Sequence, residues 1–147
     1  MAKLKLADAE TIIDAALAEA RKLKLAPLAV AVLDAGGHVI ACKREDGAGL
    51  VRFDIAYGKA WGALGMGFGT REIAARAEQF PAFVTALYAI SRGRAVPSPG
   101  GVLILDQDGD VIGAVGVSGD TGDNDELCAL AGLTATGLRA APGKIES

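Results

Sequence analysis

The segment 102-VLILDQDGDVIGAVGVSG-119 carries the strongest structural signal in the chain. Two apolar runs flank Asp108-Gly109, and this dipeptide favours a tight β-hairpin because glycine tolerates positive φ. A related pattern occurs earlier, in 28-LAVAVLDAGGHVIACKRE-45. When LDAGGHVIA is aligned with LDQDGDVIG, His38 stands at the position of Asp110. We therefore predict two β-hairpins with the same local architecture, and a turn of this kind does not need a histidine.

The first hairpin is predicted to have a two-residue type I′ turn at Gly36-Gly37, because both central positions of that turn take positive φ. Residues that pair across antiparallel strands project to the same side of the sheet. The predicted register gives three pairs on one side: Leu33 with Ile40, Ala31 with Cys42, and Ala29 with Arg44. In this register His38, Cys42 and Arg44 share one face.

Helical periodicity and capping residues complete the assignment. Helices are predicted over residues 7–24, 53–66, 70–79, 82–92 and 123–138, and residues 93–101 form a loop. Thr70 is the expected N-cap of the third helix, and Asp123 or Asn124 that of the last. The order of helix, hairpin, several helices, hairpin and helix predicts a single α/β (α+β) domain over residues 1–147. Its sheet is mainly antiparallel and is covered by helices.

Composition excludes several classes of protein. The net charge of −3 and pI near 5.1 give no basic face for nucleic acid. No apolar run approaches the roughly 18 residues that span a bilayer, and the N-terminus lacks a signal-peptide pattern. One histidine and two cysteines are too few for a closed zinc site or a disulfide framework. We expect a cytoplasmic protein without membrane or nucleic-acid partners.

Two groups of residues are candidates for chemistry. Lys59 lies on a helical stripe with Arg52 and Ile55, while Asp54 is in the first turn of the same helix. Lys59 is a general base with a lowered pKa, an anchor for a carboxylate, or a solvated side chain. Gly100-Gly101 and Gly116 allow a ligand to approach the backbone closely, or they accommodate a bend or a packed helix.

The acidic loop 118-SGDTGDNDE-126 leads into a predicted helix. Its carboxylates would repel a phosphate at the helix N-terminus. The spacing also lacks the terminal glutamate of a calcium-binding loop. We therefore interpret these acids as helix-capping residues.

Several segments resemble, in order, the GlcG/HbpS-like family, which also supplies the C-terminal domain of PduO-type corrinoid adenosyltransferases. They are 29-AVAVLDAGGHVIACKREDGA-48, DIA and KA within residues 54–60, PGG at 99–101, IGAVGVSGD at 112–120, Asp125-Glu126 and 131-AG-132. The chain departs from the family pattern at Pro99, where a third glycine is common, and in the glycine-rich region 62–83. Lys43, Arg44 and Asp46 supply a version of the family's basic and acidic residues after the second strand.

The resemblance implies a profilin-like fold, with a five-stranded antiparallel sheet and helices on both sides. It also implies a homo-oligomer, often an octamer, and haem binding in some members. On this reading His38 is the candidate metal ligand, because histidine is the usual neutral ligand of haem iron. Arg44 or Lys59 would meet the propionates.

The alternative is an isomerase or lyase that acts on a small organic acid. In that case Arg44 clamps a carboxylate and Lys59 or Asp54 moves a proton. The ligand-binding residues predicted for a small-molecule site are His38, Arg44, Asp46, Gly100, Gly101, Gly116 and Ser118. A third possibility is an accessory module whose glycine-rich surfaces serve subunit packing alone.

Overall fold

A computed structural model describes residues 3–144 of the protein. It contains one five-stranded sheet in the order β2-β1-β4-β3-β5, with every neighbouring pair antiparallel. The strands are β1 (Ala29–Asp34), β2 (Val39–Arg44), β3 (Gly101–Leu105), β4 (Val111–Ser118) and β5 (Arg139–Ala141). The helices are α1 (Leu6–Lys22), α2 (Val51–Met66), α3 (Thr70–Gln79), α4 (Pro81–Ile90) and α5 (Gly122–Thr136). The predicted α+β class and antiparallel sheet are confirmed.

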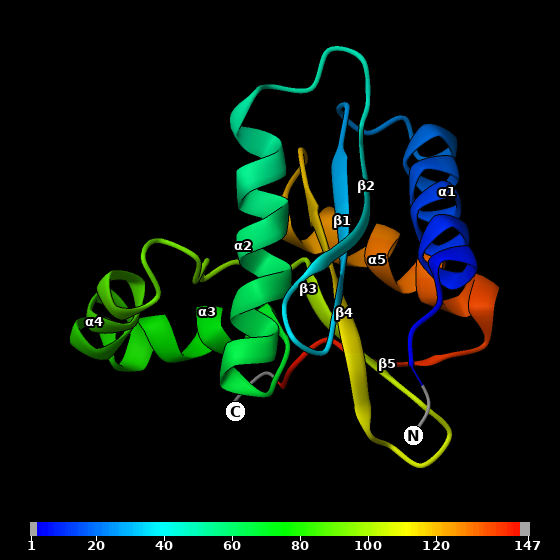
Figure 1. The fold of residues 1–147 in the computed structure, drawn as a ribbon. Helices are drawn as coiled ribbons and strands as arrows, with labels where there is room; N and C mark the ends of the chain where they lie inside the picture. Colours follow the sequence, from blue (N-terminus) through cyan, green and yellow to red (C-terminus); the bar gives the residue numbers. More distant parts are fainter. Residues whose placement is uncertain (1–2, 145–147) are drawn as a thin grey trace.

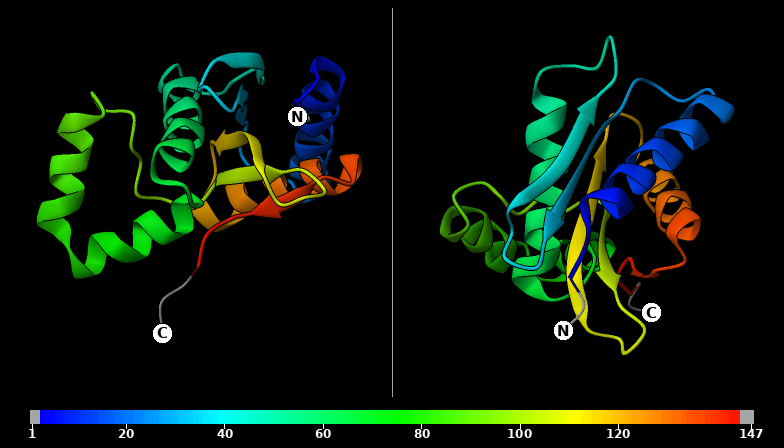
Figure 2. Two further views of the ribbon diagram at one scale, coloured as in Figure 1. Left: turned by 60° about the horizontal axis from the view of Figure 1, so that its bottom comes forward. Right: turned by 45° about the vertical axis from the view of Figure 1, so that its right-hand side comes forward.

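The sheet is covered by helices on both faces (Figure 1). α1 and α5 pack on one face, over a core that includes Ile12, Val30 and Val115. α2 packs on the other face, where its contacts are mostly alanines. α3 and α4 project away from the sheet as an arm, which Figure 2 shows from two further directions. No helix within residues 3–144 is long and apolar enough to cross a bilayer.

Small residues bring α2 unusually close to the sheet. The side of α2 that faces the strands is built from Ala56, Ala60 and Ala63, all fully buried. A Cβ atom at Gly116 would overlap with the carbonyl oxygen of Ala56, and one at Gly101 would overlap with that of Lys59. The glycines of β3 and β4 therefore admit the helix backbone itself, so the helix occupies the space that the sequence left open for a ligand.

The predicted type I′ turn of the first hairpin is wrong. Gly37 has a φ of 84°, whereas Gly36 is not among the positive-φ residues. The backbone N–H of Asp34 donates to the carbonyl of His38 (2.9 Å), and that of Gly37 donates to the carbonyl of Asp34 (3.0 Å). The loop thus has three residues and ends in a left-handed glycine, the other common hairpin design.

This loop changes which residues share a face. The pairs Ala31–Cys42 and Ala29–Arg44 are confirmed, but the register shifts between Val32 and Leu33, so Leu33 lies opposite Val39 instead of Ile40. Arg44 therefore lies on the α2 side of the sheet, since its partner Ala29 packs with Ala56. His38 lies near Leu4 and Ile112, which belong to the core beneath α1 and α5. The predicted common face for His38, Cys42 and Arg44 is wrong.

Two cap predictions are also wrong. Gly69 is the N-cap of α3, while the hydroxyl of Thr70 accepts a hydrogen bond from the backbone N–H of Gly101 (2.8 Å). The N-cap of α5 is Thr121, whose side chain accepts from the N–H of Asn124 (3.3 Å). The short edge strand β5 follows α5 directly and had no pattern of its own.

Candidate functional site

His38 stands at the rim of a pocket on the outer end of the first hairpin. Its side chain is 81% exposed. The pocket has a volume of about 360 Å³ and combines an apolar wall with a few polar groups. Its lining residues are Lys3, Leu4, Asp34, Ala35, Gly36, His38, Ile40, Val111 and Ile112. His38 is thus an accessible side chain beside an apolar hollow.

The carboxylate of Asp34 holds both the turn and the imidazole. Its Oδ1 accepts hydrogen bonds from the backbone N–H groups of Gly36 (2.9 Å) and His38 (3.0 Å), and it lies 3.2 Å from His38 Nδ1. The backbone hydrogen bond from His38 is the main cause that lowers the pKa of Asp34. A carboxylate can only accept, so Nδ1 carries a proton in this contact, and the neutral form of the ring has its lone pair at Nε2. This arrangement is the usual one for a histidine that ligates a metal.

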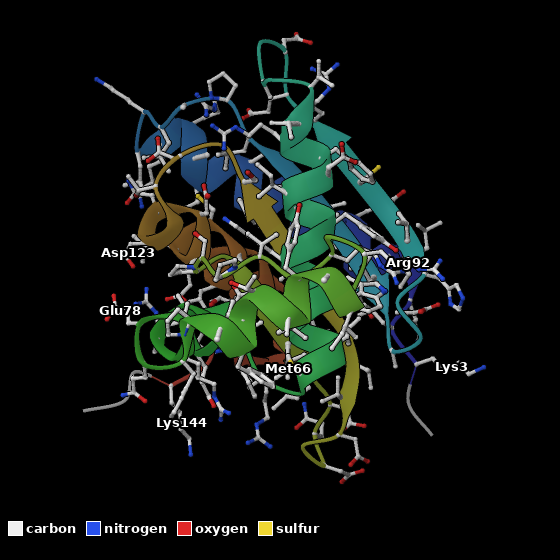
Figure 3. All side chains as sticks on the ribbon, turned by 90° about the vertical axis from the view of Figure 1, so that its left-hand side faces the viewer. Lys3, Met66, Glu78, Arg92, Asp123 and Lys144 are labelled. Carbon is white, nitrogen blue, oxygen red and sulfur yellow. The ribbon has the colours of Figure 1, made fainter. Side chains whose placement is uncertain are left out.

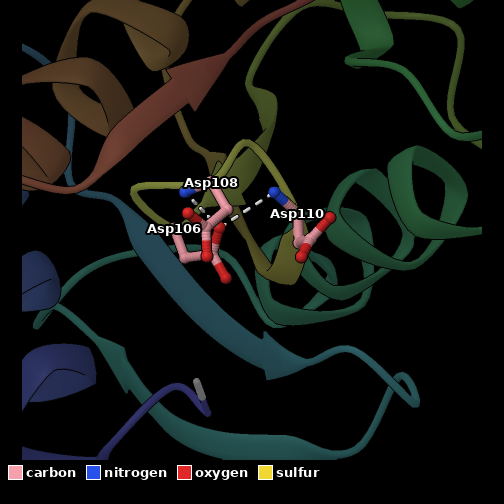
Figure 4. Close-up of side chains that lie close together, drawn as sticks. All are labelled: Asp106, Asp108 and Asp110. Carbon is pink, nitrogen blue, oxygen red and sulfur yellow. Dashed lines mark hydrogen bonds between the residues drawn. The ribbon is translucent and has the colours of Figure 1, made fainter. Parts of the chain in front are cut away.

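The second hairpin has the same turn without the imidazole. Asp106 Oδ1 accepts from the backbone N–H groups of Asp108 and Asp110, both at 2.9 Å (Figure 4). Gly109 has a φ of 85°, matching Gly37 in the first turn. Carboxylate oxygens of the three aspartates all lie within 4.8 Å of one another. In the second turn, the carboxylate of Asp110 therefore stands where the first turn has the imidazole of His38.

Lys59 forms a buried ion pair that the sequence did not anticipate. Its side chain is 3% exposed, and Nζ donates to Asp125 Oδ2 (3.0 Å) and to the carbonyl of Val117 (2.9 Å). Burial lowers the pKa of Lys59 and raises the pKa of Asp125, while the attraction between the two opposes both shifts. The interpretation of Lys59 as a solvated side chain is wrong.

The other predicted residues around Lys59 serve the same internal junction. A Cβ atom at Gly100 would lie 2.9 Å from Lys59 Nζ, so this glycine makes room for the ammonium group. Ser118 is 1% exposed and its hydroxyl accepts from Arg52 Nη1 (3.4 Å). The backbone N–H of Asp120 donates to Asp125 Oδ1 (2.9 Å). These groups connect α2, β4 and α5 through polar contacts inside the protein.

The remaining predicted residues lie apart from both places. Arg44 donates through Nη1 to the carbonyl of Ala48 (2.8 Å) and so organises the loop before α2. Asp46 and Asp54 are exposed. His38 and Arg44 stand at opposite ends of β2, so one chain does not bring them together around one ligand.

Two partners were missed by reasoning from the sequence. Asp34 was not singled out, although its alignment with Asp106 placed it at the start of both turns. Asp125 was interpreted as a capping residue, and the useful signal was Lys59 itself: a lysine among small apolar residues needs a buried acid. The loop acid Asp120 also makes internal contacts, because its carboxylate accepts from Ala26 N–H (3.0 Å) and Asn124 Nδ2 (2.7 Å).

Comparison with known proteins identifies the family. Residues 4–134 match the model of the HbpS-like family, described as haem degrading protein HbpS-like, and the chain belongs to this family. An uncharacterised 15.0 kDa protein encoded between dhaT and dhaS in Citrobacter freundii is 35% identical over 133 residues, which are 90% of this chain and 92% of that protein.

Solved structures agree with this assignment. The crystal structure of a PduOC:heme complex has a TM-score of 0.85 and 28% identity, and the match covers 94% of this chain and 98% of that one. The protein ORFY of Klebsiella pneumoniae has a TM-score of 0.83 and 30% identity, with 93% of each chain covered. The family that the sequence resembled is therefore confirmed.

Proposed function

We propose that the protein binds haem, or a closely related metallotetrapyrrole, with His38 as an axial ligand through Nε2. The observation that carries the proposal is the contact between Asp34 Oδ1 and His38 Nδ1, at 3.2 Å. It orients an exposed imidazole with its free nitrogen available, next to an apolar pocket. Membership of the HbpS-like family and similarity to a chain solved as a haem complex support the same ligand.

The residues around His38 fit one edge of a haem. Leu4, Ile40 and Ile112 supply an apolar wall for the macrocycle. Lys3 supplies an ammonium group within the same lining, where it can pair with a propionate. The pocket volume of about 360 Å³ lies at the lower end of the roughly 300–1,000 Å³ typical of ligand sites. One chain therefore covers part of the macrocycle and leaves the rest open.

Each group of the chain has a separate task in this site. Bound haem supplies an iron that exchanges ligands and electrons. Asp34 fixes the tautomer and the direction of the ring, and His38 holds the metal. Leu4, Ile40 and Ile112 exclude water from one side, which affects the reduction potential of a bound iron.

The alternative enzyme, an isomerase or lyase of a small organic acid, has less support from the geometry. Lys59 is enclosed by Asp125 and the Val117 carbonyl, whereas Asp54 is exposed on the surface of α2. A proton-transfer site needs its acid or base within hydrogen-bonding reach of a substrate. Lys59 is therefore part of the internal packing. Arg44 and Asp46 lie at and after the C-terminal end of β2, away from His38.

We also propose that the protein acts in the cytoplasm, and that it forms a homo-oligomer, which the family resemblance implies. Two features support self-association. The single-chain pocket is partial, and several large apolar side chains of α4 are exposed, among them Phe83 and Ile90. The native mass in solution measures the assembly directly, against a chain mass of 14.9 kDa.

An absorption titration tests the haem proposal. Adding ferric haem to the apoprotein should produce a Soret band with one-to-one saturation per chain. His38→Ala should lose that band or weaken binding at least about 100-fold, because loss of an axial ligand removes the main specific contact. Cys42→Ser is the matched control, since it removes the exposed thiol of β2 and leaves the imidazole in place. An identical titration for wild type and His38→Ala would overturn the assignment of His38.

A further inference from the structure

In the arm formed by α3 and α4, helix α4 exposes an unusually apolar surface. Residues 81–90 contain no charged side chain, and Val84 is the only residue of α4 that is classed as buried. Phe80, Phe83, Tyr88 and Ile90 are exposed by 59%, 54%, 57% and 79%. A helix that is apolar on most of its surface normally has partners on more than one side. In this chain α4 packs mainly on α3 and extends away from the sheet (Figure 2).

The apolar residues of α4 form a stripe with a recognisable spacing. Phe80, Phe83, Leu87 and Ile90 recur at intervals of three, four and three residues. This is the spacing of the seam between two helices packed side by side. Leu87 and Ile90 also line a shallow apolar hollow of about 180 Å³ together with Trp61 and Met66 of α2. The stripe therefore continues onto the body of the protein.

We propose that α4 is an antiparallel, two-fold dimerisation helix, and that its occupant is α4 of a second copy of this chain. In a two-fold pair centred on Thr85, residue numbers that face each other add up to 170. Phe80 then faces Ile90 of the other copy, and Phe83 faces Leu87. The apolar stripe is therefore complementary to itself when the second helix runs in the opposite direction, as an isologous interface requires.

Charges at the two ends of the arm follow the same symmetry. Glu78 precedes α4 and Arg92 follows it, and their numbers also add up to 170. Both side chains are exposed, and Figure 3 shows them at opposite ends of the arm. In the antiparallel pair Glu78 of each copy lies next to Arg92 of the other. A parallel pair would instead place like charges together.

The stripe supplies most of the area that a specific interface needs. Aromatic side chains bury about 150–250 Å² each. With the exposed fractions of Phe80, Phe83 and Ile90, the stripes of two copies together offer roughly 700 Å², against the roughly 1,000 Å² of a specific interface. Residues around the hollow, such as Met66, add to that area. This pairing rests on the self-association proposed above and assigns it to the surface of α4.

Sedimentation equilibrium of the full chain provides the test. Wild type should form a dimer or a larger even-numbered assembly at micromolar concentration, with a monomer of 14.9 kDa. Phe83→Asp and Ile90→Asp should raise the dimer dissociation constant at least about 30-fold, the effect of losing one interface hot spot. Leu50→Asp, which changes a residue that is 89% exposed before α2, is the matched control and should leave the assembly intact.

A charge exchange tests the antiparallel register separately. Glu78→Arg and Arg92→Glu should each weaken the dimer about twofold to fivefold per ion pair, because each creates two like-charge contacts. The double variant should return to the wild-type constant within about twofold. Circular dichroism of every variant should match wild type, which excludes loss of folding as the cause.

The outcomes separate this inference from the proposed function. A monomeric wild type would overturn both the pairing and the proposed self-association. An oligomer that is insensitive to Phe83→Asp and Ile90→Asp would overturn the α4 interface and leave self-association standing. Failure of the double charge variant to restore the dimer would overturn the antiparallel register. Haem binding is measured independently by its Soret band, and the α4 variants should retain it.

Discussion

The two hairpin turns have the same backbone design but different side chains. In each, an aspartate accepts hydrogen bonds from the N–H groups two and four residues later, and a left-handed glycine comes three residues after the aspartate. Even the register irregularities correspond, between Val32 and Leu33 in one hairpin and between Ile104 and Leu105 in the other. The turn therefore forms equally well with His38 or with Asp110 at its end. His38 is therefore not needed for the turn, and its side chain is free for the proposed role in binding.

The surroundings of the two aspartates also differ. Asp106 is buried, whereas Asp34 is half-buried. The first turn also borders the pocket of about 360 Å³. The first turn thus combines its structural role with an accessible imidazole beside a pocket.

Making the first turn resemble the second should have the largest effect. His38→Asp gives the first hairpin the residue found at the end of the second, so the fold should persist with a stability change within about 0.5 kcal/mol. The affinity for ferric haem should fall at least about 100-fold, because the variant replaces histidine, a usual ligand of haem iron, with a carboxylate. Spectroscopic titration and thermal unfolding of the same sample measure both effects. Retained haem affinity would contradict the assigned role of His38.

The next effect compares the two aspartates. Asp106→Ala should lower the free energy of unfolding by about 2–3 kcal/mol, since two backbone N–H groups near the core lose their partner. Asp34→Ala should cost about 1 kcal/mol, because water can reach the N–H groups of the more exposed turn. Urea unfolding at neutral pH measures both values. If Asp34→Ala lowered the free energy of unfolding more than Asp106→Ala, solvent exposure of the turn would not explain the difference between the two variants.

The two glycines should behave alike. Gly37→Ala and Gly109→Ala each place a side chain in the left-handed region, at φ values of 84° and 85°, and each should cost about 1–2 kcal/mol. A Cβ atom at Gly37 would lie 3.3 Å from Trp61, and one at Gly109 would lie 3.5 Å from Arg139. The two losses should therefore agree within about 0.5 kcal/mol. Denaturant unfolding of the two variants side by side provides the comparison, and a difference of several kcal/mol would mean that the turns are not equivalent.

The smallest expected effect is on the pH dependence of stability in acid. The N–H groups of His38 and Gly36 hold the pKa of Asp34 below its ordinary value. A lowered pKa in the folded state contributes stability that is complete above the pKa of the unfolded chain and is lost as the pH falls through the folded value. Unfolding measured between about pH 5 and pH 2 should therefore be less pH-dependent in Asp34→Asn than in wild type. Two-dimensional NMR of the Asp34 carboxyl should give a midpoint below that of a free aspartate; a midpoint above it would contradict the hydrogen-bonding account.

The comparison of the turns also indicates what sequence alone can predict. The hairpins, the helices and the family were predictable, because alternating strands, helical periodicity and turn dipeptides are local signals. The choice between a two-residue and a three-residue loop at Gly36-Gly37 was not, since both designs use glycine. That choice shifted the register by one residue and moved His38 to the side of the sheet opposite Arg44. The change is confined to the residues next to the turn, since Ala31–Cys42 and Ala29–Arg44 pair as predicted. Because His38 is one of those residues, the predicted site could not be assembled correctly.

The role of the glycines was similarly beyond local reasoning. Gly101 and Gly116 indicate that some group lies close to the strand backbone, but the sequence does not show which group. In the structure it is the backbone of α2. The buried pair of Lys59 and Asp125 joins residues 66 positions apart, a separation at which local patterns carry no pairing information. Site prediction therefore depended on tertiary contacts at both places.

The central claim is that the imidazole of His38 binds the metal of a tetrapyrrole through Nε2 while Nδ1 stays bonded to Asp34. The chain has one histidine, so ¹⁵N labelling of histidine gives a single ring spectrum. We predict that zinc protoporphyrin, which is diamagnetic and takes an axial nitrogen ligand, shifts the Nε2 resonance strongly and leaves Nδ1 in its protonated state. Ring resonances that stay unchanged at saturating porphyrin would contradict the claim.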